Sequence, residues 1–283
     1  MSSPKRFLIP DGYNQESRAK FAEVRMRLAW ELYRDLLVKY MPGAEYEVWL
    51  SSDEESRDGY TVDELKAFDG ILWPGCNLTV YHDVPEVKRH LELCERAFEA
   101  GLPQFGSCWA IQVATVVCGG SVGPCDKGRE MGVGQKILLT EEGVKHPMFA
   151  GKPRVYSHFM SHDDEVKALP AAGVHLAGNG WSDVQAAAFT YKNGEMWAIQ
   201  YHPEYDLNEV ARLIEAREEK LTRLGFFGDN HGTTMKDYVT RLDQLVAAPH
   251  RKDLRWQLGI DDDILDDGVR ELEFKNWIEH FYG

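Results

Sequence analysis

Short apolar runs alternate with amphipathic stretches over residues 7–117, and this alternation restricts the fold more than any other feature. Apolar runs that end in turns lie at 7–10, 46–50 and 69–75. Stretches with the periodicity of a helix lie between them, at 21–37 and 85–100. Repeated alternation of strand and helix is typical of a parallel β-sheet that has helices on both faces.

The pattern changes after Gly119, where helices give way to closely spaced strands and turns. The predicted strands cover residues 134–140, 154–159, 174–179, 185–191 and 196–201. A helix is predicted over 207–224, followed by two more in the remainder. The sequence therefore predicts an α/β fold: a flavodoxin-like three-layer sandwich with a mostly parallel sheet, an antiparallel extension and a C-terminal helical appendage. We expect one domain over 1–225 and a helical extension over 226–283.

Charge and composition exclude several classes of protein. The 283 residues carry a formal net charge of −14, which disfavours binding to nucleic acid or to an anionic membrane surface. No run of about 18 apolar residues is present, and the N-terminal apolar run reads as a strand and not as a signal peptide. Five cysteines without a C-x-x-C pair indicate neither a disulfide framework nor a zinc site. We expect a cytoplasmic protein.

Cys108 stands at a predicted turn between the strand at 104–106 and a helix that runs to about residue 117. Ligands bind at the carboxyl ends of strands in parallel sheets, and a helix N-terminus lowers the pKa of a thiol. The residue is thus a candidate nucleophile at a strand-turn-helix elbow. A small buried core residue is the alternative, and the turn alone does not separate the two.

The motif His202-Pro203-Glu204 follows the apolar run at 196–200 and so also lies at a predicted strand end. A cysteine nucleophile requires a base, usually a histidine that a third group orients. Glu204 is close enough in sequence to reach the imidazole of His202. The alternative is a proline that ends a strand beside a surface histidine.

Together these motifs resemble those of the class I glutamine amidotransferases, which use a G-x-C-x-G-x-Q elbow and an H-P-E strand end. Gly106, Cys108 and Gln112 match the elbow, and the resemblance extends over about residues 5–215, in particular to stand-alone glutaminases of the GMP synthase type. It implies a catalytic triad of Cys108, His202 and Glu204. Ala110 stands where the family has glycine, which we expect to affect the fit of the substrate.

The resemblance also implies an oxyanion hole. In the family, a glycine-rich turn after an earlier strand supplies one N–H and the residue after the cysteine supplies another. The corresponding positions here are Gly75, Cys76 and Trp109. Such donors stabilise the tetrahedral oxyanion of acyl transfer. A plain Pro-Gly turn is the alternative for Gly75, and Cys76 is read as a small residue of the site wall.

Two further segments resemble parts of the family's glutamyl pocket. Residues 128–132 contain Arg129 and Glu130, and residues 161–164 contain Ser161 and His162. The resemblance implies that these groups, with Gln112 of the elbow motif, hold the α-amino and α-carboxyl groups of the substrate. The alternatives are a buried, paired Glu130 and a solvated acidic turn at 163–165.

The predicted reaction is hydrolysis of a γ-glutamyl amide, glutamine or a γ-glutamylated amine, through a thioester on Cys108. It needs no cofactor, and the histidines lack the helix spacing of a metal site. The same motifs also fit a glutaminase subunit that delivers ammonia to a separate synthetase, or a non-catalytic binding or regulatory domain. The C-terminal helices could pack onto the main domain, cover the site as a lid or form a homodimer contact.

Overall fold

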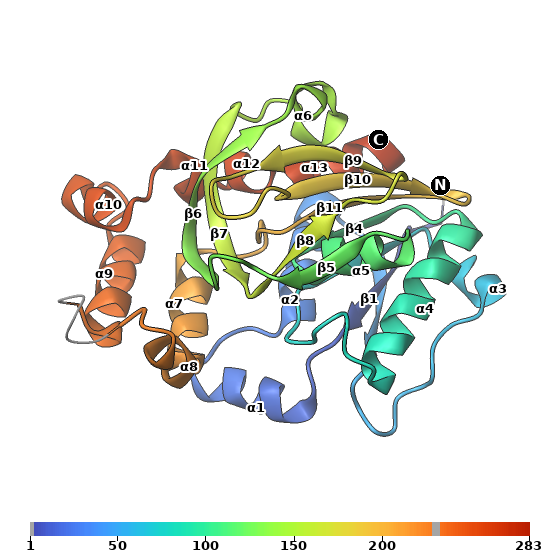
Figure 1. The fold of residues 1–283 in the computed structure, drawn as a ribbon, viewed down its shortest axis with the longest axis horizontal. Helices are drawn as coiled ribbons and strands as arrows, with labels where there is room; N and C mark the ends of the chain where they lie inside the picture. The colour runs from blue at the N-terminus through green and yellow to red at the C-terminus, as the bar shows by residue number, and fades with distance from the viewer. Residues whose placement is uncertain (1–2, 228–232) are drawn as a thin grey trace.

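A computed structural model describes residues 3–227 and 233–283 of the chain. Residues 228–232, which belong to the predicted C-terminal extension, lie outside the described residues. A nine-stranded sheet in the order β2-β1-β3-β4-β11-β10-β9-β6-β7 forms the centre (Figure 1). Its strands are β1 (Arg6–Asp11), β2 (Glu45–Leu50), β3 (Gly70–Trp73), β4 (Gln104–Ser107), β6 (Glu130–Leu139), β7 (Val155–His162), β9 (Gly173–Gly178), β10 (Ala186–Tyr191) and β11 (Gly194–Ile199).

The sheet has a parallel half and an antiparallel half, as the sequence predicts. Strands β2, β1, β3, β4 and β11 are parallel, in the order that defines flavodoxin-like sheets. Strands β10, β9, β6 and β7 extend the sheet with antiparallel pairs. A separate two-stranded sheet of β5 (Ser121–Pro124) and β8 (Asp164–Ala168) was not predicted. Strand β8 includes part of the acidic segment 163–165, for which a solvated turn was the alternative.

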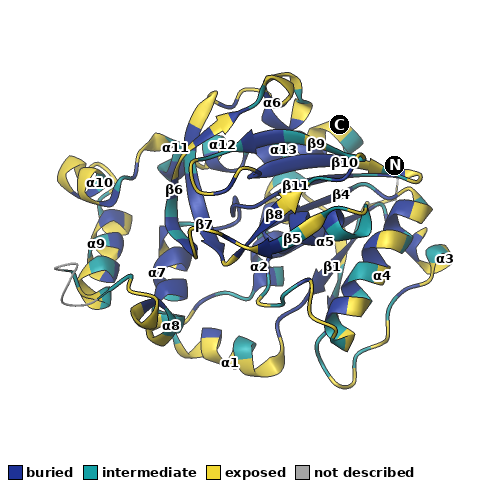
Figure 2. Cartoon of the chain, in the orientation of Figure 1, coloured by how far each residue is buried: buried dark blue, intermediate teal, exposed yellow. Residues whose placement is uncertain are grey.

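Helices flank the sheet, and the strands between them are mostly buried (Figure 2). The helices are α1 (Gln15–Glu23), α2 (Ala29–Tyr40), α3 (Val62–Leu65), α4 (Pro85–Ala100), α5 (Trp109–Val117), α6 (Glu141–Lys145), a 3-10 turn η1 (Pro147–Phe149), α7 (Leu207–Ala216), α8 (Glu218–Arg223), α9 (Met235–Ala247), α10 (Lys252–Leu258), α11 (Asp262–Leu265), α12 (Asp267–Arg270) and α13 (Leu272–Tyr282).

Two helices predicted as continuous are interrupted. The stretch at 21–37 is divided between α1 and α2, with Arg25 in the left-handed region at a φ of 60°. Its apolar stripe serves two cores, because Phe21 packs among residues of α7 and α9 whereas Leu37 packs beneath the sheet. The stretch at 207–224 is divided at Arg217 into α7 and α8. Helical periodicity does not reveal such breaks, because the apolar residues stay in phase.

Helix α13 of the predicted C-terminal extension belongs to the core under the sheet. Phe274 and Trp277 are fully buried, and the Trp277 ring lies 5.9 Å from that of Phe105 in β4. Helix α9 packs instead against α7. The sequence-based suggestion that the tail packs back onto the main domain thus describes α13, whereas the boundary at residue 225 stays a prediction.

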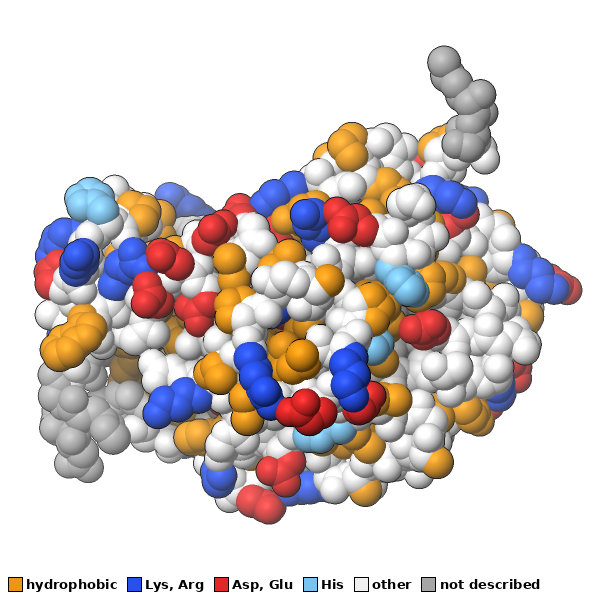
Figure 3. Space-filling model, turned by 90° about the horizontal axis from the view of Figure 1, so that it is seen from above, with side chains coloured by type: hydrophobic (Ala, Val, Ile, Leu, Met, Phe, Trp, Pro, Cys, Tyr) orange, Lys and Arg blue, Asp and Glu red, His pale blue; other side chains and the backbone are white. Residues whose placement is uncertain are grey.

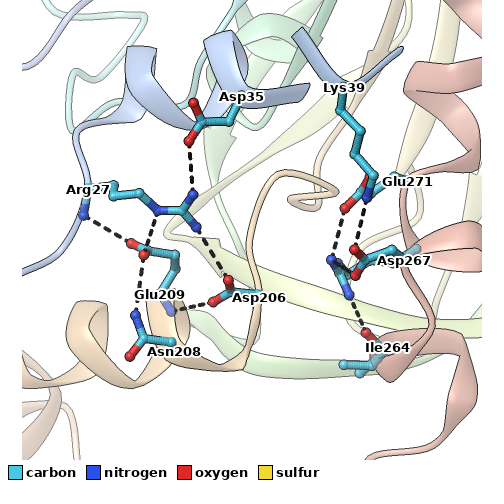
Figure 4. A network of polar contacts seen from close by, with 10 residues as sticks. Arg27, Asp35, Lys39, Asp206, Asn208, Glu209, Ile264, Asp267 and Glu271 are labelled. Atoms are coloured by element: carbon cyan, nitrogen blue, oxygen red, sulfur yellow. Dashed lines mark hydrogen bonds and ion pairs between the residues drawn. The ribbon is translucent and has the colours of Figure 1, made fainter. Parts of the chain in front are cut away.

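Ion pairs tie helix α2 and the turn before it to distant parts of the chain (Figure 4). Arg27 contacts Glu209 at 2.9 Å and Asp206, the N-cap of α7, at 3.3 Å. Lys39 contacts Glu271, between α12 and α13, at 2.7 Å. These contacts fix α7 and the C-terminal helices beside α2.

The outer surface mixes charges of both signs. On the face in Figure 3, lysine and arginine side chains lie among aspartate, glutamate and apolar ones. Within the described ranges, no helix is both long enough and apolar enough to cross a membrane.

Candidate active site

Cys108 occupies a strained turn between β4 and α5. Its φ of 50° is uncommon for a residue with a side chain, and its N–H donates to the carbonyl of Ile199 in β11 over 2.7 Å. Strain of this kind is found at functional sites and is the geometry of a nucleophile elbow. The predicted strand-turn-helix placement is therefore present.

Gly106 makes this turn compact. A Cβ at this position would lie 2.5 Å from both Cβ and the carbonyl oxygen of Trp73, and 2.6 Å from the methyl group of Ala110. Ala110 is fully buried in the core and does not line the cavity described below. The Ala110 methyl group therefore has no direct contact with the cavity, and its expected effect on the fit of the substrate stays a prediction.

His202 and Glu204 lie beside this turn because β11 pairs with β4, with Ile199 opposite Ser107. His202 Nδ1 and Glu204 Oε1 are 2.7 Å apart, and the Ser107 hydroxyl donates to the same carboxylate oxygen over 2.9 Å. The ring of Tyr205 stacks on the imidazole with 4.2 Å between centroids. Glu204 and Tyr205 together fix the orientation of the His202 ring.

Gly75 lies between His202 and Cys108. A Cβ built on Gly75 would be 2.8 Å from Cε1 of His202 and 3.4 Å from Cβ of Cys108. Since Glu204 occupies Nδ1, the nitrogen left to accept a proton is Nε2, which is buried and has no hydrogen-bond partner among the described residues. The structure thus brings together the residues of the predicted triad and of the first oxyanion turn.

Trp109 begins helix α5, where backbone N–H groups have no partner within the helix. Its indole donates to Nδ1 of His90 over 2.7 Å, and Nε2 of His90 lies 2.5 Å from the Ser51 hydroxyl. Burial lowers the pKa of His90 to about 3, so this imidazole stays neutral. A neutral, fully hydrogen-bonded support therefore anchors the residue that follows Cys108.

A cavity of about 480 Å³ opens at the carboxyl ends of β1, β3 and β4, where ligand sites of such sheets lie. Its lining includes Cys76 and Cys108, both of which are free thiols. The other lining residues from these turns and from α1 are Tyr13, Ser17, Lys20, Phe21, Asn77, Leu78, Thr79, Trp109 and Gln112. Arg129, the end of β7, the start of β8 and helices α7 and α8 line the opposite side.

Comparison with known proteins identifies the family of the chain. The family model for glutamine amidotransferase class-I matches residues 36–218. The chain belongs to this family. An amidotransferase structure from Thermotoga maritima superposes with a TM-score of 0.65, covering 98% of this chain and 97% of that one at 16% identity.

Two kinds of relative share sequence with this amidotransferase. A γ-glutamyl-L-1-hydroxyisopropylamide hydrolase from Pseudomonas sp. is 28% identical over 97% of this chain and 92% of its own length. A glutamine-hydrolysing GMP synthase from Streptococcus pyogenes is 32% identical over 51% of this chain, but over only 26% of its own length. The similarity to the synthase is thus confined to about a quarter of that protein.

Arg129 and Ser161 face the amidotransferase cavity, together with two residues that the sequence analysis missed. Arg129 donates to the Ser161 hydroxyl over 2.8 Å and to Asp163 over 2.6 Å. Arg217 donates to the same hydroxyl over 2.6 Å and to the Tyr13 hydroxyl over 3.1 Å. Tyr13 follows β1, so its position after a strand end could have indicated it. Arg217 lies in an apparently continuous helical pattern and gave no signal.

His162 lines the cavity, and Glu130 lies behind it. His162 Nε2 lies 2.9 Å from Glu130, which also accepts from Gln185 and from Asn179 over 2.8 Å each. The other ring nitrogen of His162 lies 3.0 Å from the carbonyl of Asp164. Glu130 does not line the cavity, so its carboxylate supports the wall from behind. The alternative of a buried, paired carboxylate describes this position.

Burial and two nearby arginines act in opposite directions on the pKa of the Cys108 thiol. Burial raises the pKa of the Cys108 thiol to about 12, against a smaller lowering by Arg129 and Arg217.

Gln112, only 4% exposed, lies on the cavity wall at the start of α5. Within the described residues, no group of three or more His, Cys, Asp or Glu side chains is placed to hold a metal ion.

Proposed function

We propose that this chain hydrolyses γ-glutamyl amides of small amines through a γ-glutamyl thioester on Cys108. The arrangement that carries the proposal is Cys108 on the cavity wall at a strained elbow, with the hydrogen-bonded His202–Glu204 pair close by at Gly75. The Pseudomonas hydrolase, which is similar over nearly the whole chain, supports hydrolysis without a synthetase and a small amine as the leaving group.

The reaction begins when the Cys108 sulfur attacks the amide carbonyl and its proton passes to Nε2 of His202. Glu204, at 2.7 Å from Nδ1, stabilises the resulting imidazolium. The backbone N–H groups of Cys76 and Trp109 receive the oxyanion. His202 then protonates the nitrogen as the C–N bond breaks. Water, deprotonated by His202, cleaves the thioester, which releases glutamate and restores the thiol.

A second candidate function is that of a glutaminase subunit that supplies ammonia to a separate synthetase. The similarity to GMP synthases over half of this chain favours it. The two functions differ in the leaving group, because a glutaminase requires glutamine itself. A cytoplasmic location belongs to the proposal too and is supported by the five free cysteines; a homodimer remains an expectation.

The test is mass-spectrometric detection of glutamate and amine after the purified chain is incubated with L-glutamine and with γ-glutamyl amides of small amines. We expect hydrolysis that Cys108→Ala abolishes and Cys118→Ala, which removes another free thiol, preserves. A diazo-ketone analogue of glutamine should alkylate Cys108 stoichiometrically. Absence of both hydrolysis and alkylation would establish a non-catalytic domain, and turnover of glutamine alone would favour the glutaminase.

A further inference from the structure

Two guanidinium groups converge on one neutral hydroxyl in the wall of the cavity. The Ser161 oxygen accepts from Arg129 at 2.8 Å and from Arg217 at 2.6 Å. Arg217 has no carboxylate within ion-pair distance among the described residues; its other contact is the Tyr13 hydroxyl. Arg129 is buried and Arg217 is partly buried, and two cations that share only a neutral partner are costly to remove from water unless an anion joins them.

The charges around this serine do not balance. Asp163 is shared by Arg129 and Lys220, at 2.6 Å from each. The cluster therefore holds three cations, Arg129, Arg217 and Lys220, and one carboxylate. This excess of positive charge occurs inside a chain whose net charge is −14, and it faces the cavity. Burial, and after it the positive charge of Arg217, lowers the pKa of Arg129.

The cluster adjoins the nucleophile. The carbonyl oxygen of Ser161 is 3.8 Å from the Cys108 sulfur, and the hydroxyl of the same serine contacts both arginines. Ser161 thus contacts both the Cys108 sulfur and the guanidinium group of Arg217. Only three carbons separate the α-carboxylate of a γ-glutamyl group from the amide carbon, so a subsite for this carboxylate must lie close to the Cys108 sulfur.

We propose that Arg217 is a specificity-determining residue, which joins Arg129 and Ser161 of the glutamyl pocket expected from the family in binding the α-carboxylate of the γ-glutamyl group. This inference rests on the proposed function and assigns to it a specificity-determining residue. The planar fork of an arginine presents paired N–H donors that match a carboxylate. The break between α7 and α8 places Arg217 on the cavity wall, facing Tyr13 and Ser161.

The experiment compares three isopropylamides as substrates. The γ-glutamyl amide carries both α groups, the glutaryl amide keeps the carboxylate alone, and the 4-aminobutyryl amide keeps the amine alone. We expect wild-type kcat/KM for the 4-aminobutyryl amide to be at least about 10-fold below that for the glutaryl amide. Arg217→Gln should lower kcat/KM for the two carboxylate substrates roughly 10- to 100-fold, because their carboxylate loses a charged hydrogen bond. The 4-aminobutyryl amide has no such carboxylate, so its kcat/KM should stay unchanged.

Arg212→Ala serves as a matched control, since this arginine lies in α7, which ends just before Arg217, and pairs with Glu215 and Asp243 outside the cavity. Arg217→Lys, which keeps the charge but not the fork, should fall between wild type and Arg217→Gln. A folded Arg217→Gln protein, verified by thermal unfolding, that loses all three activities equally would contradict the subsite. So would a wild type that cleaves the 4-aminobutyryl amide as well as the glutaryl amide.

A binding measurement separates this inference from the proposed function. Calorimetry with L-glutamate on Cys108→Ala should show binding that is weakened roughly 10- to 100-fold when Arg217→Gln is added. If wild type cleaves no amide but this difference is found, the reaction is wrong and the anion subsite stands. If amides are cleaved and glutamate binds equally to both variants, the subsite is wrong and the reaction stands.

Discussion

At the scale of single residues, opposing influences act on the thiol of Cys108. The sequence placed it at a helix N-terminus, which would lower its pKa, and two arginines of the cavity act in the same direction. Burial is the larger effect and raises the pKa to about 12. The free protein therefore holds a neutral thiol, and in the proposed reaction its proton passes to His202 as the substrate is attacked.

This resting state predicts how alkylation of Cys108 by iodoacetamide depends on pH. Below a raised pKa the thiolate fraction grows about tenfold per pH unit, so we expect the rate to rise roughly tenfold per unit from pH 7 to pH 9 without a plateau. Mass spectrometry of the Cys108 peptide separates this thiol from the other four. A plateau below pH 8 would instead indicate a thiolate–imidazolium pair formed in advance.

Gly106 gives a second prediction at this scale. The methyl group of Gly106→Ala would lie 2.5 Å from the backbone oxygen of Trp73, so strands β3 and β4 would have to separate. We expect a loss of about 1–3 kcal/mol in the free energy of unfolding, measured in urea, with reduced activity because the elbow moves. Gly180→Ala, where an added Cβ meets nothing within 4 Å, should leave both unchanged. An equal effect at the two glycines would argue against this close packing.

The residues that could be predicted carry their signal in local sequence. Cys108 and His202 each follow an apolar strand within a short motif, so their meeting required only that two strands be neighbours. Arg217 could not be predicted, since its role depends on a helix break and on contacts with Tyr13 and Ser161, far away in the sequence. Glu130 was placed in the correct segment, but whether its carboxylate faces the cavity depends on Gln185 and the other partners that surround it.

At the scale of elements, strong apolar periodicity predicted where helices form, but it did not predict whether a helix is continuous. Helix α4 spans Pro85–Ala100 as predicted, because a proline begins it and the left-handed Gly101 ends it. The α7–α8 break escaped prediction because the apolar pattern continues through it. The packing of α13 beneath the sheet could not be predicted either, since it depends on pairs such as Lys152 and Glu273, which lie far apart in the sequence.

Glu273 in α13 supports the strand end that carries His202. It accepts from Tyr201, the neighbour of His202, over 2.7 Å and pairs with Lys152 over 2.9 Å, with both charged side chains fully buried. Glu273→Ala leaves a buried ammonium unpaired, so we expect a loss of about 3–5 kcal/mol in the free energy of unfolding, measured in urea. Activity should fall as well, because Tyr201 loses its acceptor.

Replacing both partners tests the origin of that loss. Glu273→Leu combined with Lys152→Met removes the charges together, and buried pairs replaced in this way are often no less stable. We therefore expect the double variant to unfold at a higher urea concentration than Glu273→Ala. A double variant that is less stable than the single one would show that packing or the Tyr201 contact, not the unpaired charge, dominates.

At the scale of the whole molecule, the core beneath the sheet is built from both ends of the chain. The ring of Trp277 contacts Phe7 of β1 and Phe105 of β4, and Phe274 lies 5.4 Å from Phe105. Figure 1 shows α13 lying against the central strands. The predicted extension at 226–283 thus includes an element that covers the face of the sheet under the nucleophile elbow.

Truncation after residue 225 should therefore prevent stable folding. Removing one buried phenylalanine or tryptophan costs about 3–5 kcal/mol, and truncation removes Phe274 and Trp277 together, whereas a whole domain is stable by only about 5–15 kcal/mol. We expect an aggregated or unfolded product by size-exclusion chromatography and circular dichroism. Trp277→Ala in the full chain should remain folded but lose about 3–5 kcal/mol. A monodisperse, fully active truncated protein would contradict both a stabilising and a lid role, because the sheet would then be stable without its C-terminal cover.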